Sequence, residues 1–215
     1  MAVRNIPKNY LVVTGGHSSH KNTVMNGFEG TLEPEYMLLL DFDETVESYD
    51  EQPVVVPVPG VPAGYTPDVL VRYFARTGKP PKLVEVKRTD YLEAKKEEYA
   101  PKFAAAEAYC ARVSWDFHIA TEVEIRTPRL KNCKFLSAYR NYKPDEQDID
   151  RVLDTAEHLG DAAANVSIVE ALSKTDDDRL YWIPIVWHCV VQRWLLCDLD
   201  TEFADEVLMY LPEDK

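Results

Sequence analysis

Residues 65–87 read YTPDVLVRYFARTGKPPKLVEVK, two short apolar runs separated by a turn rich in Gly and Pro. Asp68 accompanies the first run, and Glu85 and Lys87 lie in the second. Side chains alternate between the two faces of a strand, so Glu85 and Lys87 point the same way while Val86 points into the core. If the two runs pair as a hairpin, Asp68 lies beside them. The stretch therefore predicts a strip of sheet that carries two carboxylates and one ammonium group.

This spacing resembles PD-x(16)-E-x-K, the pattern of the PD-(D/E)xK nucleases. Hydrolysis of a phosphodiester at neutral pH uses hard oxygen ligands for Mg²⁺, with a cation near the attacking water or the scissile phosphate. A lysine two residues after a glutamate is also common on a solvated strand face. The rest of the chain therefore has to support the nuclease interpretation.

Composition indicates a soluble globular protein. The 215 residues are 46% hydrophobic and 28% charged, enough for one large domain or a domain with a small appendage. No apolar run reaches the roughly 18 residues that a membrane span needs, and the N-terminus lacks the apolar core of a signal peptide. Four cysteines without a CxxC pair are typical of buried free thiols in a cytosolic protein.

Charge is distributed unevenly along the chain, whose net charge is −13. Residues 1–140 hold 18 basic and 19 acidic side chains, a balance of −1, whereas residues 141–215 hold 6 basic and 18 acidic side chains, a balance of −12. A strongly acidic segment repels a phosphate backbone, so we expect it to contact protein instead. The sequence therefore predicts a catalytic domain over residues 1–142 and an acidic partner-binding domain over residues 143–215.

The order of expected elements favours a mixed α/β sheet flanked by helices. A helix is expected at 32–42, because Thr31 precedes it and Pro34 suits its first turn. Pro101 is expected to kink or restart a long helix. The expected elements of the first domain are a helix at 32–42, a bent strand at 46–49 and 53–58, the two strands of the quoted stretch, a helix at 91–113 and a strand at 115–125. This order is similar to the core of restriction-endonuclease-like folds.

The second domain is expected to be small and mostly helical, with a winged-helix variant as one form. Asp176–Asp178 is interpreted as a charged turn, and Trp182, Trp187 and Trp194 as core residues. The remaining expected elements are helices at 145–159 and 166–173, a helix or strand pair at 181–196 and a strand near 207–211.

Several motifs in one order resemble the TnsA family, the endonuclease subunits of heteromeric cut-and-paste transposases. The resemblance is close over about residues 12–142. In the remainder of the chain it is limited to helical character. The motifs are GHSSHKN (16–22), FEGTLE (28–33), LLLDFD (38–43), YDEQP (49–53), YTPDVLV (65–71), LVEVK (83–87) and FHIATEVEIRTPRLKN (117–132).

The resemblance implies roles for individual residues. The implied catalytic residues are Glu33, Asp68, Glu85 and Lys87, of which the three acids are also metal ligands. Pro34 follows the first glutamate directly and departs from the expected approach to the metal. Glu29 and Glu35 are therefore alternatives for that role.

The implied activity is a Mg²⁺-dependent endonuclease that cuts the 5′ strand at transposon ends in double-stranded DNA. The implied site holds one or two Mg²⁺ ions, with Mn²⁺ as a substitute. A DDE-type transposase, TnsB, would cut the other strand, and an AAA+ ATPase, TnsC, would regulate the reaction in the bacterial cytoplasm, at the nucleoid. The expected DNA contacts are Lys21, Arg88, Arg126, Arg129 and Lys131. Two alternatives remain open: a stand-alone restriction or repair nuclease, and a non-catalytic scaffold subunit that holds DNA.

Overall fold

The computed structural model describes residues 14–17, 21, 26–29 and 31–212. The chain divides into two compact units, Met1–Arg126 and Thr127–Lys215. This division falls earlier than the boundary expected at residue 142. Helix α5 (Pro128–Ser137) packs against α8 (Asp176–Val191), so the basic segment that follows Arg126 belongs to the second unit.

A four-stranded mixed sheet forms the centre of the first unit. Its strands lie in the order β3-β6-β7-β8, with β3/β6 and β6/β7 antiparallel and β7/β8 parallel. Their bounds are β3 (Val46–Glu51), β6 (Val69–Tyr73), β7 (Lys82–Val86) and β8 (Asp116–Ala120). The sheet confirms the predicted mixed α/β, restriction-endonuclease-like fold, and β6 and β7 form the predicted hairpin.

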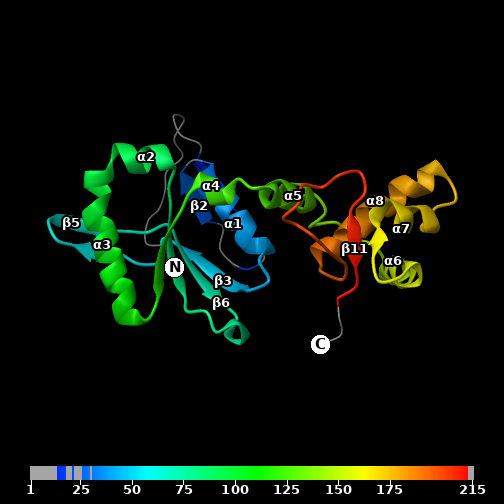
Figure 1. Cartoon of the computed structure of the whole chain (residues 1–215), viewed down its shortest axis with the longest axis horizontal. Coiled ribbons are helices and arrows are strands. Elements are labelled where there is room, and N and C mark those ends of the chain that lie inside the picture. The colour runs from blue at the N-terminus through cyan, green and yellow to red at the C-terminus, as the bar shows by residue number, and fades with distance from the viewer. Residues whose placement is uncertain (1–13, 18–20, 22–25, 30, 213–215) are drawn as a thin grey trace. The chain divides into compact units, whose positions relative to one another are not determined.

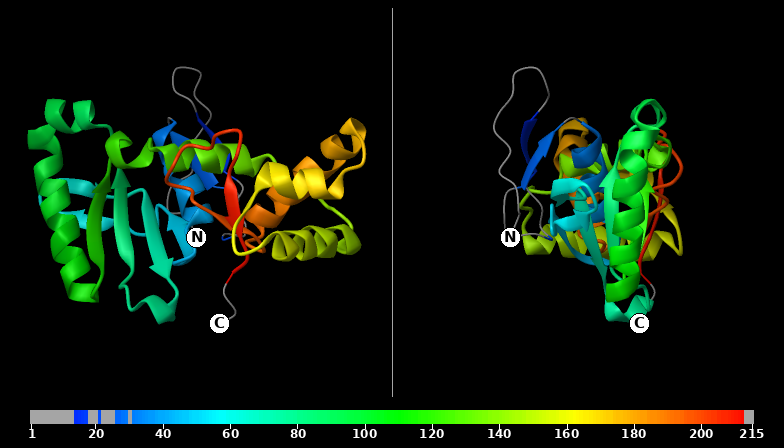
Figure 2. Two further views of the ribbon diagram at one scale, coloured as in Figure 1. Left: turned by 45° about the vertical axis from the view of Figure 1, so that its right-hand side comes forward. Right: turned by 90° about the vertical axis from the view of Figure 1, so that its left-hand side faces the viewer.

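Helices cover both faces of this sheet, as Figures 1 and 2 show for α1 and α3. Helix α1 (Leu32–Phe42) has the predicted bounds, buries Met37 and contacts β3 and β7. Helix α3 (Lys96–Val113) packs on the face that carries Leu70 and Leu83. Strand β7 is therefore covered on both sides, and Glu85 is only 3% exposed although it is charged.

The expected continuation of the first strand is a separate hairpin. Strands β4 (Val56–Val58) and β5 (Val61–Tyr65) pair antiparallel. Gly64 has φ +69°, and a Cβ atom there would lie 2.6 Å from Val55 Cγ1 and 2.8 Å from the Val56 oxygen. Only glycine fits that close approach.

Two expected elements have different limits in the structure. The long helix breaks at Lys95 into α2 (Thr89–Ala94) and α3, which continues through Pro101. Pro101 is the sixth residue of α3, where it removes the backbone hydrogen bond that its N–H would donate to the carbonyl of Glu97. The strand expected at 115–125 ends at Ala120 and is followed by the short helix α4 (Glu122–Ile125), because Glu122 turns to accept hydrogen bonds from the backbone N–H and hydroxyl of Thr89.

Two smaller elements complete the first unit. The Gly-rich segment near the N-terminus contains β1 (Thr14–His17), which pairs antiparallel with β2 (Asn26–Glu29). A short 3₁₀ turn, Ala75–Thr77, connects β6 to β7 and ends at Gly78, whose φ is +65°.

The second unit combines helices with a small sheet, as Figure 2 shows for α6, α7, α8 and β11. Asp176–Asp178 is the first turn of α8 and not a separate turn, because Thr175 and Asp178 form a reciprocal capping box. Trp182 and Trp187 are buried, as predicted, whereas Trp194 is 38% exposed and its prediction as a core residue is wrong. The remaining elements are α6 (Glu146–Leu159), α7 (Asn165–Leu172) and the three-stranded sheet β10-β11-β9, made of Leu196–Cys197, Leu208–Tyr210 and Ala163–Ala164.

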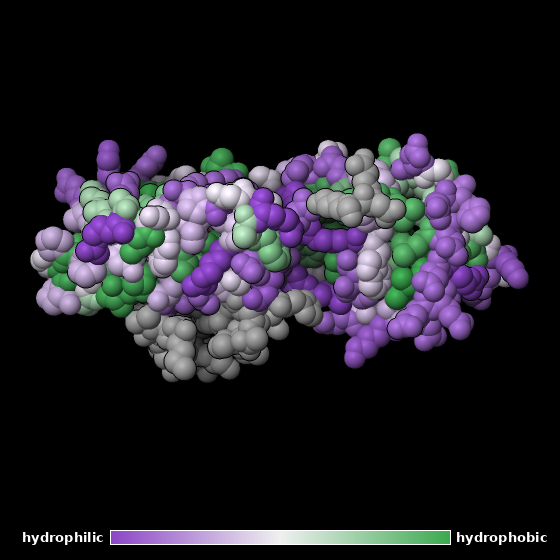
Figure 3. All heavy atoms as spheres, turned by 90° about the horizontal axis from the view of Figure 1, so that it is seen from below, coloured by the Kyte–Doolittle hydropathy of each residue, from purple (hydrophilic) through white to green (hydrophobic). Residues whose placement is uncertain are grey.

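The surface mixes polar and apolar residues over the face drawn in Figure 3. Within the described residues, no helix is both long enough and apolar enough to cross a membrane. All four cysteines are free thiols, and three of them are buried.

Candidate active site

Asp68 directly precedes β6, and its carboxylate reaches across to the neighbouring strand. Val69 lies opposite Val84 in the β6/β7 register. Asp68 Oδ2 therefore accepts a hydrogen bond of 2.8 Å from the backbone N–H of Val86. The Asp68 carbonyl accepts a second bond of 2.8 Å from the N–H of Gln52, whose φ of +45° lies in the left-handed region. These bonds orient Asp68 toward the end of β7.

Three oxygen atoms surround the ammonium group of Lys87. Its Nζ lies 2.9 Å from Glu85 Oε1, 3.4 Å from the carbonyl oxygen of Val86 and 3.5 Å from Asp68 Oδ2. The side chains of Glu85, Asp68 and Lys87 are 4%, 13% and 25% exposed, respectively. The structure thus brings together the three residues predicted from the hairpin, in a partly dehydrated cluster with two acids and one cation.

Tyr65 holds the other oxygen of Glu85. The Tyr65 hydroxyl donates a hydrogen bond of 2.7 Å to Glu85 Oε2 inside the protein. The Tyr65 ring packs against Phe103 of α3, with centroids 6.2 Å apart. Because one oxygen of Glu85 is bound by Tyr65, the other is left facing Lys87.

Burial raises the pKa values of the two carboxyls, and repulsion by Asp68 adds to the rise at Glu85. Burial raises the pKa of Asp68, and this effect exceeds the lowering by Lys87. Burial, followed by the nearby Asp68, raises the pKa of Glu85 to about 7. Burial alone would lower the pKa of Lys87, but Asp68 and Glu85 reverse that effect and raise it. Lys87 therefore keeps its proton at neutral pH, and the two acids share one positive charge.

A pocket of about 410 Å³ opens beside this cluster. It contains the predicted residues Glu33, Lys87, Arg88 and Arg126. Glu33 lies in the first turn of α1, close enough to help raise the pKa of Lys87. The lining residues are Thr31, Leu32, Glu33, Val86, Lys87, Arg88, Tyr91, Lys95, Tyr99 and Arg126.

Of the two alternatives to Glu33, only Glu35 has a described side chain. Arg126 Nε lies 2.8 Å from Glu35 Oε2, and its Nη2 donates to the Thr31 hydroxyl at 3.2 Å, so Glu35 is engaged in an ion pair. Glu29 lies in β2, and its side chain is outside the described part of the structure.

Three of the predicted DNA contacts do not line this pocket and have partners within the protein. Lys21 Nζ donates to the carbonyls of Leu40 and Asp43 at 2.5 and 2.6 Å, at the end of α1. Arg129 and Lys131 belong to the second unit. Arg129 Nη1 lies 3.1 Å from Asp200 Oδ1, and Lys131 Nζ lies 2.8 Å from Glu202 Oε2.

The donor set near Lys87 fits a divalent metal ion of the Mg²⁺ type. Two carboxylates and one backbone carbonyl already converge on a cation, and Mg²⁺ prefers hard oxygen ligands. Among the described residues, no group of three or more His, Cys, Asp or Glu side chains is arranged to hold a metal. The oxygens available to such an ion are those of Asp68, Glu85 and the Val86 carbonyl, and Glu33 lines the adjoining pocket.

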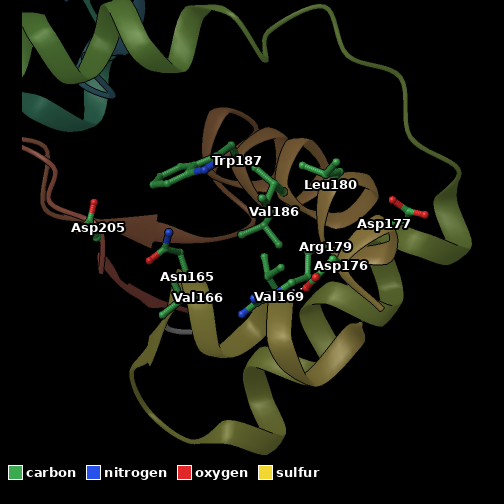
Figure 4. Close-up of a pocket in the computed structure, with 11 residues that line it drawn as sticks. Asn165, Val166, Val169, Asp176, Asp177, Arg179, Leu180, Val186, Trp187 and Asp205 are labelled. Carbon is green, nitrogen blue, oxygen red and sulfur yellow. Dashed lines mark ion pairs between the residues drawn. The ribbon is translucent and has the colours of Figure 1, made fainter. Parts of the chain in front are cut away.

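The second unit has a groove of a different kind, with a volume of about 580 Å³. Its wall is formed by apolar residues of α7 and α8, including Val169, Val186 and Trp187. Figure 4 shows Asp205 and Asp177 on opposite sides of these apolar residues. We call this feature the α7–α8 groove.

Sequence reasoning did not identify Tyr65, Tyr91 or Lys95 as parts of the site. Tyr65 stands three residues before Asp68 in the quoted stretch, but its contact with Glu85 depends on the β4/β5 hairpin and on packing against Phe103 of α3. Tyr91 and Lys95 reach the pocket because α2 turns back after β7.

One comparison with known proteins bears on this site. Residues 43–122 match the family model described as "TnsA-like endonuclease N terminal". No curated protein matches the chain. A domain of this family indicates a nuclease in Tn7-like transposition, with DNA as its substrate. The matched segment is therefore a TnsA-like endonuclease domain, and it contains Asp68, Glu85 and Lys87, the three residues of the cluster described above.

Proposed function

We propose that this chain is a metal-dependent DNA endonuclease of the PD-(D/E)xK type that cuts the 5′ strand at transposon ends. The single observation that carries the proposal is the convergence of three oxygens on Lys87 within the matched segment. A TnsB-type DDE transposase would cut the other strand, and a TnsC-type AAA+ ATPase would control assembly. The reaction would take place in the bacterial cytoplasm, at the nucleoid.

Asp68, Glu85 and the Val86 carbonyl are the proposed ligands of Mg²⁺, with Mn²⁺ as a substitute. Glu33 is the proposed further ligand, because it lines the same pocket as Lys87. When bound, the ion would lower the pKa of a coordinated water and neutralise charge on the phosphate oxygens. Tyr65 fixes one oxygen of Glu85 by its 2.7 Å hydrogen bond, so it acts as a positioning residue.

Lys87 is proposed to stabilise negative charge and not to act as a base. Its raised pKa keeps it protonated at neutral pH in this arrangement. A protonated ammonium can neutralise the charge that develops on a phosphate during hydrolysis, but it cannot accept a proton. Its position at the edge of the pocket suits contact with the scissile phosphate.

The second unit is proposed to bind the protein partners through the α7–α8 groove. Residues 127–215 hold 10 basic and 18 acidic side chains, a balance of −8. Arg129 and Lys131 are already paired with acids of the same unit, which reduces their availability to DNA. An apolar groove with Asp177 and Asp205 at its sides suits a partner segment that combines apolar and basic residues.

The test is strand-resolved cleavage of an end-labelled transposon-end duplex by the full chain. The reaction is run with Mg²⁺ or EDTA, and with or without the cognate transposase and ATPase. We expect a Mg²⁺-dependent cut of the 5′ strand only in the complete assembly. Strong cutting without partners would instead identify a stand-alone nuclease, and no cut on that strand under any condition would leave a DNA-holding scaffold.

A further inference from the structure

The lining of the pocket beside Lys87 is unusually cationic for this protein. Lys87, Arg88, Lys95 and Arg126 contribute four positive charges, and Glu33 contributes the single negative one. The whole chain, in contrast, has a net charge of −13. A concave site with this balance on an acidic protein favours a ligand that carries phosphate.

Two tyrosines give the same pocket aromatic walls, and they differ in how free their rings are. Tyr99 stacks on Phe103, with centroids 5.3 Å apart and planes at 4°. Tyr91 is 53% exposed, and within the described part of the chain its ring makes no stacking or cation–π contact. Tyr91 therefore offers an open aromatic face, which is the group on which nucleobases of any sequence stack.

The cations of the pocket differ in how strongly they are already paired. Arg88 makes two bonds of 3.0 Å to Asp90, and Arg126 lies 2.8 Å from Glu35. Lys95 Nζ is 3.9 Å from a Glu98 oxygen, and both side chains are about half exposed, at 51% and 53%. Such a pair contributes little, so Lys95 can exchange it for a phosphate at small cost.

We propose that this pocket receives one nucleotide of the DNA, unstacked from the duplex next to the phosphate that is cut. Its base lies against Tyr91 and its phosphate against Lys95, while the scissile phosphate meets Lys87. The volume of about 410 Å³ is within the usual range for small-molecule sites. Stacking on Tyr91 offsets part of the free energy lost when the base leaves the duplex. The proposal rests on the nuclease function proposed above and adds to it a subsite for a nucleobase.

The test measures binding of the full chain to a fluorescent transposon-end duplex by anisotropy, at low salt and with Ca²⁺ replacing Mg²⁺. Tyr91→Leu removes the aromatic face but keeps apolar volume, and we expect it to weaken binding about tenfold. Tyr91→Phe keeps the face and should bind like the wild type. A series of duplexes, each lacking one base, locates the subsite. When the missing base is the one beside the cut that enters the pocket, wild type and Tyr91→Leu should have equal affinity, because the base that stacks on Tyr91 is gone.

A matched pair of lysines tests the phosphate contact. Lys95→Gln should reduce the slope of log affinity against log salt by about one. Lys102→Gln removes the same charge from the other lysine that pairs with Glu98, outside the pocket, and should leave the slope unchanged.

The subsite is overturned if the wild type does not bind the duplex, if Tyr91→Leu binds like the wild type, or if its defect persists whichever base is removed. If the wild type cuts DNA in the assay above and any of these results is also obtained, the subsite is wrong and the proposed nuclease function stands. Tyr91-dependent binding without cleavage supports the subsite and overturns the nuclease.

Discussion

The two pockets of this protein have opposite character, although both belong to one acidic chain. The pocket beside Lys87 has four cationic side chains, one acid and two tyrosines. The α7–α8 groove has three aspartates, one arginine and an apolar wall. The first combination is typical of nucleic-acid contact and the second of protein contact. The net charge of the chain is therefore an average over two surfaces of opposite character.

The two units also differ in the surroundings of their lysine side chains. In the first unit, Lys87 is held by buried acids next to a pocket. In the second unit, Lys131 is 66% exposed and pairs with Glu202 on the surface. A buried cluster of this kind persists only where its charges are paired, whereas a surface pair contributes little. The contrast favours a functional role for the first lysine and a local structural role for the second.

The largest effect is expected from Lys87→Met, which removes the cation from the first pocket and keeps the side-chain length. We expect the 5′-strand cut in the full assembly to slow by about 10²–10³-fold, because charge stabilisation at the phosphate is lost. The metal-free variant should also lose about 3 kcal/mol of stability at pH 8, because Asp68 and Glu85 are left without their shared cation. Single-turnover cleavage and urea denaturation measure the two effects.

Lys82→Met is the matched control, since Lys82 begins the strand that Lys87 directly follows and lies outside the pocket. It should change neither measurement appreciably. Equal losses in both variants would mean that Lys87 matters only as one of the charged residues at the ends of β7.

A smaller effect is expected from pH, through the buried acid Glu85. Its pKa is about 7 in the folded protein against 4.5 for the free side chain, so the folded state keeps a proton that the unfolded state releases. The stability that this proton contributes is complete below pH 4.5 and is lost as pH rises through about 7. Between pH 5 and 8 the metal-free wild type should lose about 2 kcal/mol relative to Glu85→Gln. If the free energies of unfolding of the wild type and Glu85→Gln changed in parallel with pH in EDTA, the raised pKa of Glu85 would be contradicted.

The smallest of these effects concerns the α7–α8 groove. Asp177→Lys combined with Asp205→Lys reverses the charge at its two sides, and we expect about tenfold weaker binding to the ATPase partner. Binding to the DNA duplex should not weaken. The control, Asp150→Lys with Glu157→Lys, makes the same change of charge on α6, outside the groove. Calorimetry of the full chain with the partner compares them, and equal losses would show a general charge effect in place of a docking groove.

Much of the first unit could be predicted because its signals are local. Helix α1 begins and ends where the capping residue and the apolar spacing predicted. Asp68, Glu85 and Lys87 meet because strand alternation and a short turn determine their relative positions. Such features depend on a few neighbouring residues, so one sequence is enough to predict them.

The features that sequence reasoning missed depend on long-range packing. The strand predicted at 115–125 includes Glu122, but the bonds of Glu122 to Thr89, far away in the sequence, favour a helix there. Arg129 and Lys131 have the composition of a DNA contact, yet α5 packs into the second unit beside Asp200 and Glu202. Free basic residues cannot be told from paired ones until their partners are known.

The most direct test of the central claim, that the Asp68–Glu85–Lys87 cluster is the cutting site, compares Asp68→Asn with Asp50→Asn. The amide oxygen introduced by Asp68→Asn can still accept the hydrogen bond from the Val86 N–H, so the change removes charge with little change of shape. Asp50 is a strand aspartate of the same sheet that pairs with Arg72 on the surface. In the complete assembly with Mg²⁺, Asp68→Asn should slow the 5′-strand cut by about 10²–10³-fold, while Asp50→Asn and the cut on the other strand stay within about twofold of the wild type. Wild-type cutting by Asp68→Asn would contradict the account.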